Sequence, residues 1–263
     1  MNALIFDCDG VLADTERDGH RVAFNQAFAE RGIDFAWSVE DYARALQTAG
    51  GKERLRVLLT PEFARRHGIA DSDVDSCVAA LHARKTEVFV ELLAAGALQA
   101  RPGVKRLAEQ ASGEGWRLAV ASTSAHASVR AVLDHAVGVE LARSFSVFAG
   151  DDVKHKKPAP DIYLRAIAGI DVSMLDAAVV EDSEIGVRAA RSAGLPVIAT
   201  SSAYTGDEDL SQAGIVVDSL GDPGGPLLAV KANESGISIT DSIELEHIRG
   251  LLLSGRVGQE VGE

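Results

Sequence analysis

Residues 2–14 read Asn-Ala-Leu-Ile-Phe-Asp-Cys-Asp-Gly-Val-Leu-Ala-Asp, and this stretch decides the fold. The apolar run from Asn2 to Phe6 predicts a short buried strand, and Asp7 and Asp9 follow at its end. Side chains alternate between the faces of a strand, so both carboxylates point the same way if the strand continues. Carboxylates this close repel each other, and a divalent cation would offset the repulsion. Taken alone, the stretch fits an Asp-rich turn equally well, because Asp and Gly dominate turns.

Polar side chains at the ends of two further predicted strands favour a site. Apolar runs at 117–121 and 177–180 each predict a strand, and a lysine lies in the loop between them, directly before a proline. The carboxyl ends of parallel strands lie at one edge of an open sheet, where ligands bind. We therefore expect a cation and phosphate site with a carboxylate nucleophile, completed by Ser122, Thr123, Ser124, Lys157, Glu181 and Asp182.

The predicted elements divide the chain into two parts. Residues 1–14 and 100–263 alternate short, Val- and Ala-rich strands with helices, which is typical of βαβ units in a buried parallel sheet. Residues 15–99 are predicted to be almost wholly helical. The expected fold is α/β, a doubly wound, Rossmann-like core with an inserted α-helical cap, and we expect hinges near 13–15 and 98–103. Strands are expected at 2–6, 118–121, 146–148, 178–180, 197–199 and 215–217, and helices at 17–30, 52–59, 74–93, 183–193 and 242–253.

Composition narrows the class of protein. The 263 residues include 26 basic and 39 acidic side chains, and the net charge is −13. Nucleic acids and anionic membranes demand a basic face, so neither is an expected partner. Cys8 and Cys77 are too few for a disulfide framework, which fits a reducing compartment. With a strand at residue 2 and no apolar run of membrane-spanning length, we expect a cytoplasmic protein. We also expect it to be a monomer whose partner is a small-molecule substrate.

The motifs, in this order, resemble those of the haloacid dehalogenase-like hydrolase superfamily: Asp7-Cys8-Asp9-Gly10-Val11, Ser122, Lys157-Pro158 and Glu181-Asp182. Further segments resemble its CbbY and β-phosphoglucomutase-like subfamily: Asp14-Thr15-Glu16, Gly50-Gly51-Lys52-Glu53-Arg54, 157–163, 181–186 and 200–205. The resemblance covers nearly the whole chain. It implies a Mg²⁺-dependent phosphoric monoester hydrolase that acts on a small sugar phosphate. For CbbY-type enzymes that substrate is xylulose 1,5-bisphosphate, an inhibitor of the Calvin-cycle carboxylase.

The catalytic roles follow from the chemistry of the residues and agree with those in the superfamily. Asp7 is the expected nucleophile, because a carboxylate is already ionised at neutral pH and attack on phosphorus yields an aspartyl phosphate. Asp9 is expected to act as general acid and base, for which its pKa would have to be raised. Ser122 and Lys157 are expected to hold the phosphate and offset its charge.

A Mg²⁺ ion is the expected cofactor. Asp182 should be a direct ligand, and Glu181 a second ligand or one that acts through water. The superfamily pattern adds Asp7 and the backbone carbonyl of Asp9. A Glu-Asp pair at a strand end is more often the acidic first turn of a helix, and only the Asp7–Asp9 pair on the same sheet edge favours the metal.

Residues of the cap are expected to choose the substrate. Glu16 has the position of a residue that CbbY-type enzymes turn toward the substrate hydroxyls. Lys52 and Arg56 are predicted to share one helix face, and with Lys85 they are candidates for binding a second phosphate. Ordinary surface charge is the competing interpretation for each of the three. From the core, Thr123, Ser124 and His126 are further candidates for contact with the substrate.

One departure bears on the choice between a phosphatase and a phosphohexose mutase. β-Phosphoglucomutases carry a histidine four residues after the hinge threonine. Here that position is Gly19, and the histidine is His20. On an α-helix one residue is about 100°, which would aim His20 elsewhere. A mutase is therefore the weaker hypothesis. Two other functions are disfavoured. A receiver-like signalling module would leave the cap and Asp9 unexplained. A dehalogenase would require neither Asp9 nor the Glu181-Asp182 pair.

Overall fold

The computed structural model describes residues 1–202 and 204–260, and for 255–260 it describes the backbone. Ala203, within the motif at 200–205, and residues 261–263 of the predicted core lie outside the described residues. The core is a sheet in the order β3-β2-β1-β4-β5-β6-β7, parallel except for β7. Its strands are β1 (Ala3–Phe6), β2 (Arg117–Ala121), β3 (Phe145–Phe148), β4 (Ala177–Glu181), β5 (Val197–Thr200), β6 (Ile215–Val217) and β7 (Ala232–Asn233). The predicted α/β fold and its six strands are confirmed, and β7 is too short to leave a sequence pattern.

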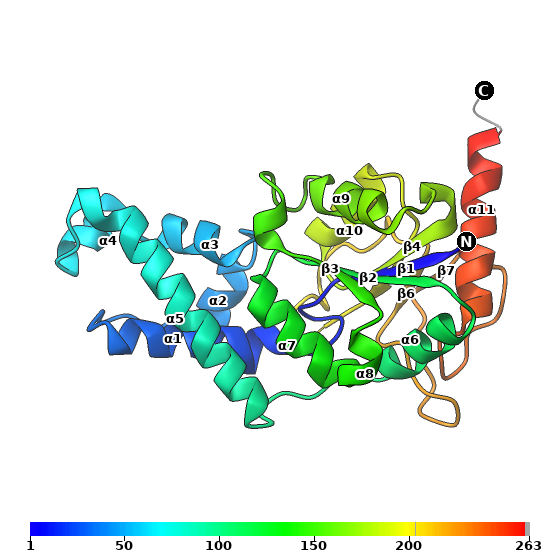
Figure 1. Cartoon of the computed structure of the whole chain (residues 1–263), viewed down its shortest axis with the longest axis horizontal. Helices are drawn as coiled ribbons and strands as arrows, with labels where there is room; N and C mark the ends of the chain where they lie inside the picture. Colours follow the sequence, from blue (N-terminus) through cyan, green and yellow to red (C-terminus); the bar gives the residue numbers. More distant parts are fainter. Residues whose placement is uncertain (203, 261–263) are drawn as a thin grey trace.

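Helices cover both faces of the sheet. The side chains of β1 point alternately to the two faces and therefore belong to two hydrophobic clusters. Leu4 and Phe6 belong to the cluster shared with α6 (Val104–Gly113), α7 (His126–Val137) and α11 (Leu245–Glu260). Ala3 and Ile5 belong to the cluster shared with α9 (Asp161–Ile170) and α10 (Glu184–Ser192). Figure 1 shows α9 and α10 on one side of the strands and α6 on the other. The short α8 (Val139–Ala142) and the 3-10 turns η3 (Gly150–Asp152) and η4 (Met174–Asp176) complete this part.

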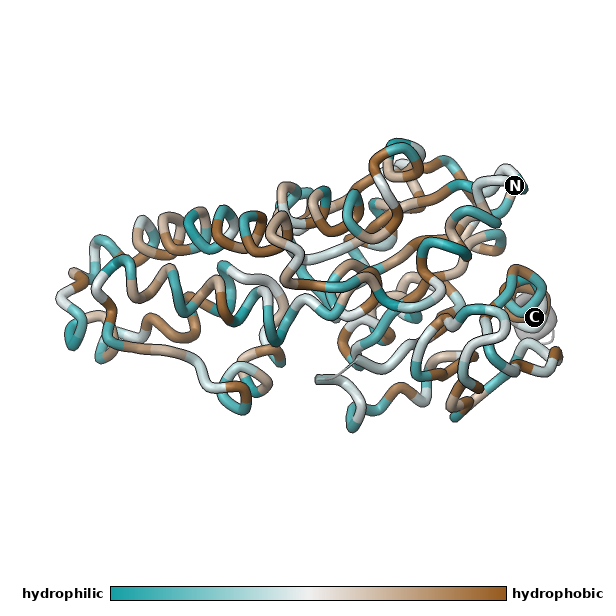
Figure 2. The backbone as a smooth tube through the Cα atoms, turned by 90° about the horizontal axis from the view of Figure 1, so that it is seen from below, coloured by the Kyte–Doolittle hydropathy of each residue, from teal (hydrophilic) through white to brown (hydrophobic). Residues whose placement is uncertain are grey.

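The helices between β1 and α6 form a cap beside the sheet, at the left of Figure 1. They are η1 (Glu16–His20), α1 (Arg21–Glu30), α2 (Val39–Ala45), α3 (Gly51–Leu58), α4 (Pro61–Arg66), η2 (Asp71–Asp73) and α5 (Val74–Ala94). An aromatic cluster of Phe24, Phe28, Trp37 and Tyr42 fills its interior. Hydrophobic and hydrophilic residues alternate along the long helices of the tube in Figure 2, as one-sided burial requires. The base of α5 also packs on α7, so the cap rests on the core.

The two connections between cap and core lie side by side. Ala13 and Ala100 form an isolated antiparallel bridge, and the backbone N–H of Arg101 donates to the carbonyl of Leu12 at 3.0 Å. The buried Arg101 guanidinium ties this crossing to the sheet edge through the backbone carbonyls of Gly10, Ser201 and Asp218. In the part of the chain that the structure describes, no helix combines the length and apolar composition needed to cross a membrane.

Candidate active site

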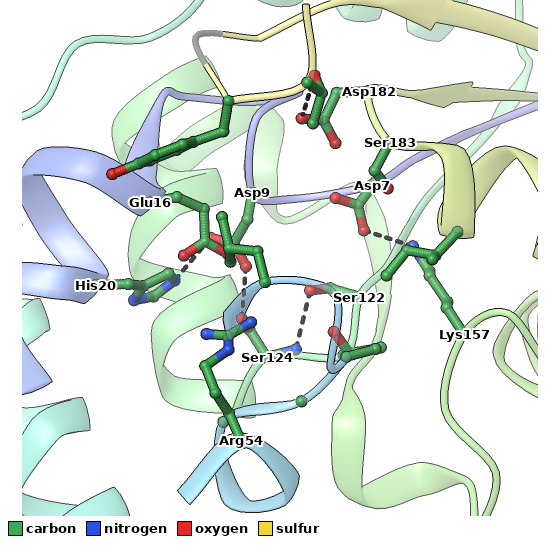
Figure 3. Close-up of a pocket in the computed structure, with 18 of the residues that line it drawn as sticks. Asp7, Asp9, Glu16, His20, Arg54, Ser122, Ser124, Lys157, Asp182 and Ser183 are labelled. Atoms are coloured by element: carbon green, nitrogen blue, oxygen red, sulfur yellow. Dashed lines mark hydrogen bonds and ion pairs between the residues drawn. The ribbon is translucent and has the colours of Figure 1, made fainter. Parts of the chain in front are cut away.

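A cavity of about 880 Å³, open to solvent, lies between the cap and the carboxyl edge of the sheet. The core contributes Asp7, Asp9, Ser122, Thr123, Ser124, Lys157 and Asp182 to its lining. The cap contributes Glu16, His20, Gln47, Arg54, His82 and Lys85. Figure 3 shows the labelled side chains gathered around this space.

Lys157 is the buried cation at the base of the cavity. Its Nζ donates to Asp7 Oδ1 at 2.6 Å, to Glu181 Oε1 at 2.7 Å and to the Ala121 carbonyl at 3.1 Å. All three ammonium protons are therefore used, and the charge is held directly against the candidate nucleophile. Burial and the neighbouring Glu181 and Asp9 carboxylates raise the pKa of Asp7 to about 7, although Lys157 opposes the rise.

Three buried carboxylates share this corner, and they fit a divalent cation. Asp7, Glu181 and Asp182 offer oxygens within 4.8 Å of one another. With one lysine among them, the ionised cluster carries two uncompensated negative charges. Burial and the nearby Glu181 and Asp7 carboxylates raise the pKa of Asp182 well above its usual range. A Cβ on Gly10, at φ +82°, would lie 2.1 Å from Asp182 Oδ2, so this glycine makes room for the carboxylate.

Glu181 differs from the other two carboxylates because its oxygens are already occupied. Oε1 accepts from Lys157 and from the Tyr163 hydroxyl at 2.6 Å. Oε2 accepts from the backbone N–H groups of Asp182 and Ser183 and from the Ser183 hydroxyl. Glu181 is 0% exposed and lies behind the cavity wall. Its position suits an anchor for Lys157, and Asp7 and Asp182 are the carboxylates left free to bind a cation.

Asp9 is held by three side chains. Oδ1 accepts from the Thr15 hydroxyl at 2.5 Å and lies 2.8 Å from His20 Nε2, and Oδ2 accepts from the Ser124 hydroxyl at 2.5 Å. Burial alone would raise the pKa of Asp9, but the charge and hydrogen bond of His20, with the two hydroxyls, hold it well below its usual range. The expected upward shift is therefore wrong for this arrangement, because charged-form hydrogen bonds outweigh burial.

His20 points at Asp9, and the expectation that it would point elsewhere is wrong. Residues Glu16–His20 form a π-helix, in which hydrogen bonds run from i to i+5 rather than i+4. The wider turn absorbs the extra residue between Thr15 and His20 and restores the direction that an α-helix would have lost. The imidazole is 2% exposed and stacks on Phe89 with ring centroids 3.9 Å apart.

The predicted substrate residues divide into those that reach the cavity and those that do not. Glu16, Lys85, Thr123 and Ser124 line it. Lys85 is 4% exposed, its ammonium faces the rings of Phe24 and Phe89, and burial lowers its pKa to about 8. It has no hydrogen-bond or ion-pair partner among the described residues.

Lys52, Arg56 and His126 lie outside the cavity. Lys52 Nζ bonds both oxygens of the core residue Asp151 at 3.0 Å, and it bridges the seam between cap and core. Arg56 points outward, toward Asp75, and His126 bonds Asp152. On α3 the buried residues are Arg54 and Leu55, and the role of Lys52 and Arg56 in binding a second phosphate stays a prediction.

Arg54 and two tyrosines were not identified from the sequence as residues of the candidate site. Arg54 is 7% exposed and lines the cavity, and its place on the apolar side of α3, four residues before Leu58, was a usable signal. Tyr42 and Tyr163 are fully buried and reach Glu16 and Glu181 through their hydroxyls. Both contacts join residues far apart in the sequence, and no local pattern indicates them.

This chain is similar to known proteins in both sequence and structure. The sequence profile of the haloacid dehalogenase-like hydrolases matches residues 1–194. A CbbY-like protein of Arabidopsis thaliana is 43% identical over 226 residues, 84% of this chain and 70% of that protein. Protein CbbY of Rhodobacter capsulatus is 42% identical over 214 residues, 81% of this chain and 91% of that protein.

A solved structure matches the fold closely. It is a mutant of CbbY from Rhodobacter sphaeroides in complex with xylulose 1,5-bisphosphate, 40% identical to this chain with a TM-score of 0.75. The superposition covers 83% of this chain and 94% of that one. The buried lysine, the carboxylate cluster and the cap thus occur in a chain whose relatives share both sequence and architecture.

Proposed function

This chain belongs to the haloacid dehalogenase-like hydrolase family and is a phosphatase, and on that premise we propose that it is a Mg²⁺-dependent sugar-phosphate phosphatase. The contact of Lys157 with Asp7 inside the carboxylate cluster carries the proposal. Lys157 offsets the charge of the nucleophile Asp7, which lies beside carboxylates that can bind a cation. Asp7 and Asp182 would hold Mg²⁺ with the backbone carbonyl of Asp9, and the ion would offset the charge on the phosphate oxygens.

The proposed reaction has two displacements at phosphorus. An oxygen of Asp7 attacks, the bond from phosphorus to the sugar oxygen breaks, and Asp9 gives that oxygen a proton. Water then attacks the aspartyl phosphate, its proton passes to Asp9, and phosphate leaves Asp7. Ser122 and Lys157 hold the phosphoryl group in place. The hydrogen bonds that favour ionised Asp9 suit the second step, in which Asp9 takes the proton from water. Asp9 then holds that proton for the first step of the next cycle, and His20 Nε2 lies 2.8 Å from its Oδ1.

The cationic residues of the cap favour a substrate with a second anionic group. Lys85 and Arg54 line the cavity from the cap, opposite the core residues, and Lys85 has no anionic partner among the described residues. Glu16 lines the same space and can accept a hydrogen bond from a sugar hydroxyl. A small sugar bisphosphate offers a second phosphate to Lys85 and Arg54 and a hydroxyl to Glu16. Xylulose 1,5-bisphosphate is the proposed substrate, and the ligand of the related CbbY structure supports it.

Phosphate release in the presence and absence of Mg²⁺ tests the proposal. We expect fast, Mg²⁺-dependent release from xylulose 1,5-bisphosphate and slow release from ribulose 1,5-bisphosphate. Equal rates on monophosphates and bisphosphates would contradict a site for the second phosphate.

One observation favours a second candidate, a phosphohexose mutase of the β-phosphoglucomutase type. His20 contacts Asp9, so the histidine contact expected to be missing is present. A mutase would convert β-glucose 1-phosphate to glucose 6-phosphate without net release of phosphate. The same assay, followed for glucose 6-phosphate, distinguishes the two activities.

A further inference from the structure

Tyr42 connects two residues of the cavity without lining it. It lies in α2 and is 0% exposed. Its hydroxyl donates to Glu16 Oε2 at 2.7 Å and accepts from Arg54 Nη1 at 2.9 Å. Glu16 and Arg54 both line the cavity, whereas Tyr42 lies behind them. One buried hydroxyl therefore bridges the carboxylate and the guanidinium that a substrate would meet.

We propose that Tyr42 is a positioning residue that makes Glu16 and Arg54 one rigid unit for recognising a sugar bisphosphate. The inference rests on the proposed function and deepens it. Glu16 accepts a hydrogen bond from a sugar hydroxyl, Arg54 attracts the phosphate that is not transferred, and Tyr42 fixes the geometry between them.

The direction of each hydrogen bond follows from the chemistry of the three groups. A guanidinium has donors only, so the Tyr42 hydroxyl must accept from Arg54 and donate to Glu16. This fixes Glu16 Oε2 as the occupied oxygen. Oε1 has no hydrogen-bond partner among the described residues and is free for a ligand. Glu16 is thereby set to accept from a hydroxyl, a group that simple aryl phosphates lack.

The Tyr42 ring is held in place by the side chains packed around it. Its ring lies 5.4 Å from that of Trp37 and 6.3 Å from that of Phe24, inside the aromatic cluster of the cap. The guanidinium of Arg54 lies over the ring, 5.1 Å from its centre.

Arg54 is also fixed to the backbone of the cap. Its Nε donates to the carbonyl of Ala45 at 3.2 Å, and its Nη2 donates to that of Thr48 at 3.3 Å. Through Tyr42, Glu16 at the hinge thus shares these anchors and keeps its position relative to Arg54.

Tyr42→Phe removes the hydroxyl and keeps the ring, and a thermal melt checks that the variant folds. The assay compares kcat and KM for xylulose 1,5-bisphosphate with those for p-nitrophenyl phosphate, which has no sugar hydroxyl and one phosphate. Losing a hydrogen bond to a charged group changes an equilibrium by about tenfold or more. We expect the ratio of the two kcat/KM values to fall by about tenfold, mainly through KM for the bisphosphate. An unchanged ratio overturns the inference and leaves the phosphatase function standing.

The coupling is tested separately with Glu16→Gln. If Tyr42 acts through Glu16, the double variant loses less selectivity than the two single losses multiplied together. Independent, fully multiplicative losses would contradict the relay.

A binding measurement keeps the test independent of turnover. Calorimetry with xylulose 1,5-bisphosphate compares Asp7→Asn protein with Asp7→Asn/Tyr42→Phe protein, and about tenfold weaker binding by the double variant is expected. Equal affinity, or no binding by either, overturns the inference. If wild-type protein hydrolyses neither substrate while this difference in binding persists, the proposed function fails and the role of Tyr42 stands.

Discussion

Replacing Lys157 by methionine removes one positive charge from a buried cluster while nearly keeping the length of the side chain. Lys157 is 6% exposed and holds Asp7 and Glu181 at 2.6 and 2.7 Å. After the substitution, the cluster of Asp7, Glu181 and Asp182 has three carboxylates and no buried cation among them. The pKa of Asp7, which burial already raises to about 7, should rise further because its opposing charge is gone.

The expected size of the effect follows from the burial of the pair. Removing one partner of a buried ion pair costs about 3–5 kcal/mol of the free energy of unfolding, because the other charge is left uncompensated. For a chain of this length, each 1 kcal/mol lowers Tm by about 2–4 °C, which gives a fall of about 6–20 °C in metal-free protein. A nucleophile that is largely protonated at pH 7, with one donor to the phosphate lost, should lower kcat by at least about 100-fold.

Thermal unfolding without metal, and phosphate release with Mg²⁺, measure the two effects. Lys154→Met is the matched control, because Lys154 lies in the same loop and is exposed. Such a surface change is expected to stay within about 0.5 kcal/mol. If Lys157→Met melted and turned over like Lys154→Met, the assigned role of the buried lysine would be refuted.

The remaining predictions concern the nucleophile, the cation and the cap. Asp7→Asn, nearly isosteric, should abolish phosphate release with the fold intact by circular dichroism, and substantial residual turnover would remove Asp7 as nucleophile. Below its pKa of about 7, Asp7 in metal-free protein carries a proton that Mg²⁺ must displace, so calorimetric Mg²⁺ affinity should fall by up to about tenfold per pH unit from pH 7 to 6. Flat affinity over that interval would contradict this linkage. Lys85→Met should raise KM for a bisphosphate at least about tenfold more than for a monophosphate, because it removes a buried charge facing the substrate. Lys52→Ala, which breaks the bridge to Asp151, should affect both substrates equally, and a selective effect would place Lys52 at the second phosphate.

The sheet was predictable because its signals are local. Each parallel strand is a short apolar run, and the polar residues directly after β1, β2 and β4 had to meet at one edge. The hydrogen bonding between β1 and β4 continues one residue past Phe6. The backbone N–H of Asp7 donates to the carbonyl of Val180 at 2.9 Å. The meeting of Asp7, Ser122 and Asp182 at one sheet edge therefore followed from the parallel strands, whereas Lys157 reaches them from a loop.

The cap was harder to predict, because its site residues depend on helix orientation and on contacts over long sequence separations. Arg56 was assigned to the cavity from charge and spacing, and the structure turns it outward. The π-helix at Glu16–His20 is a local change of period that an assumption of 3.6 residues per turn cannot reveal. Tyr42 contacts Glu16 from 26 residues away. The domain boundaries, the monomeric state and the cytoplasmic location stay predictions.

The proposed phosphatase activity is tested most directly by Mg²⁺-dependent phosphate release from xylulose 1,5-bisphosphate, measured beside β-glucose 1-phosphate and compared with the Asp7→Asn variant. We expect rapid release from the xylulose compound by wild-type protein, little from β-glucose 1-phosphate, and none from either by Asp7→Asn. Release that persists in Asp7→Asn, or conversion of β-glucose 1-phosphate to glucose 6-phosphate without release from the bisphosphate, would contradict it.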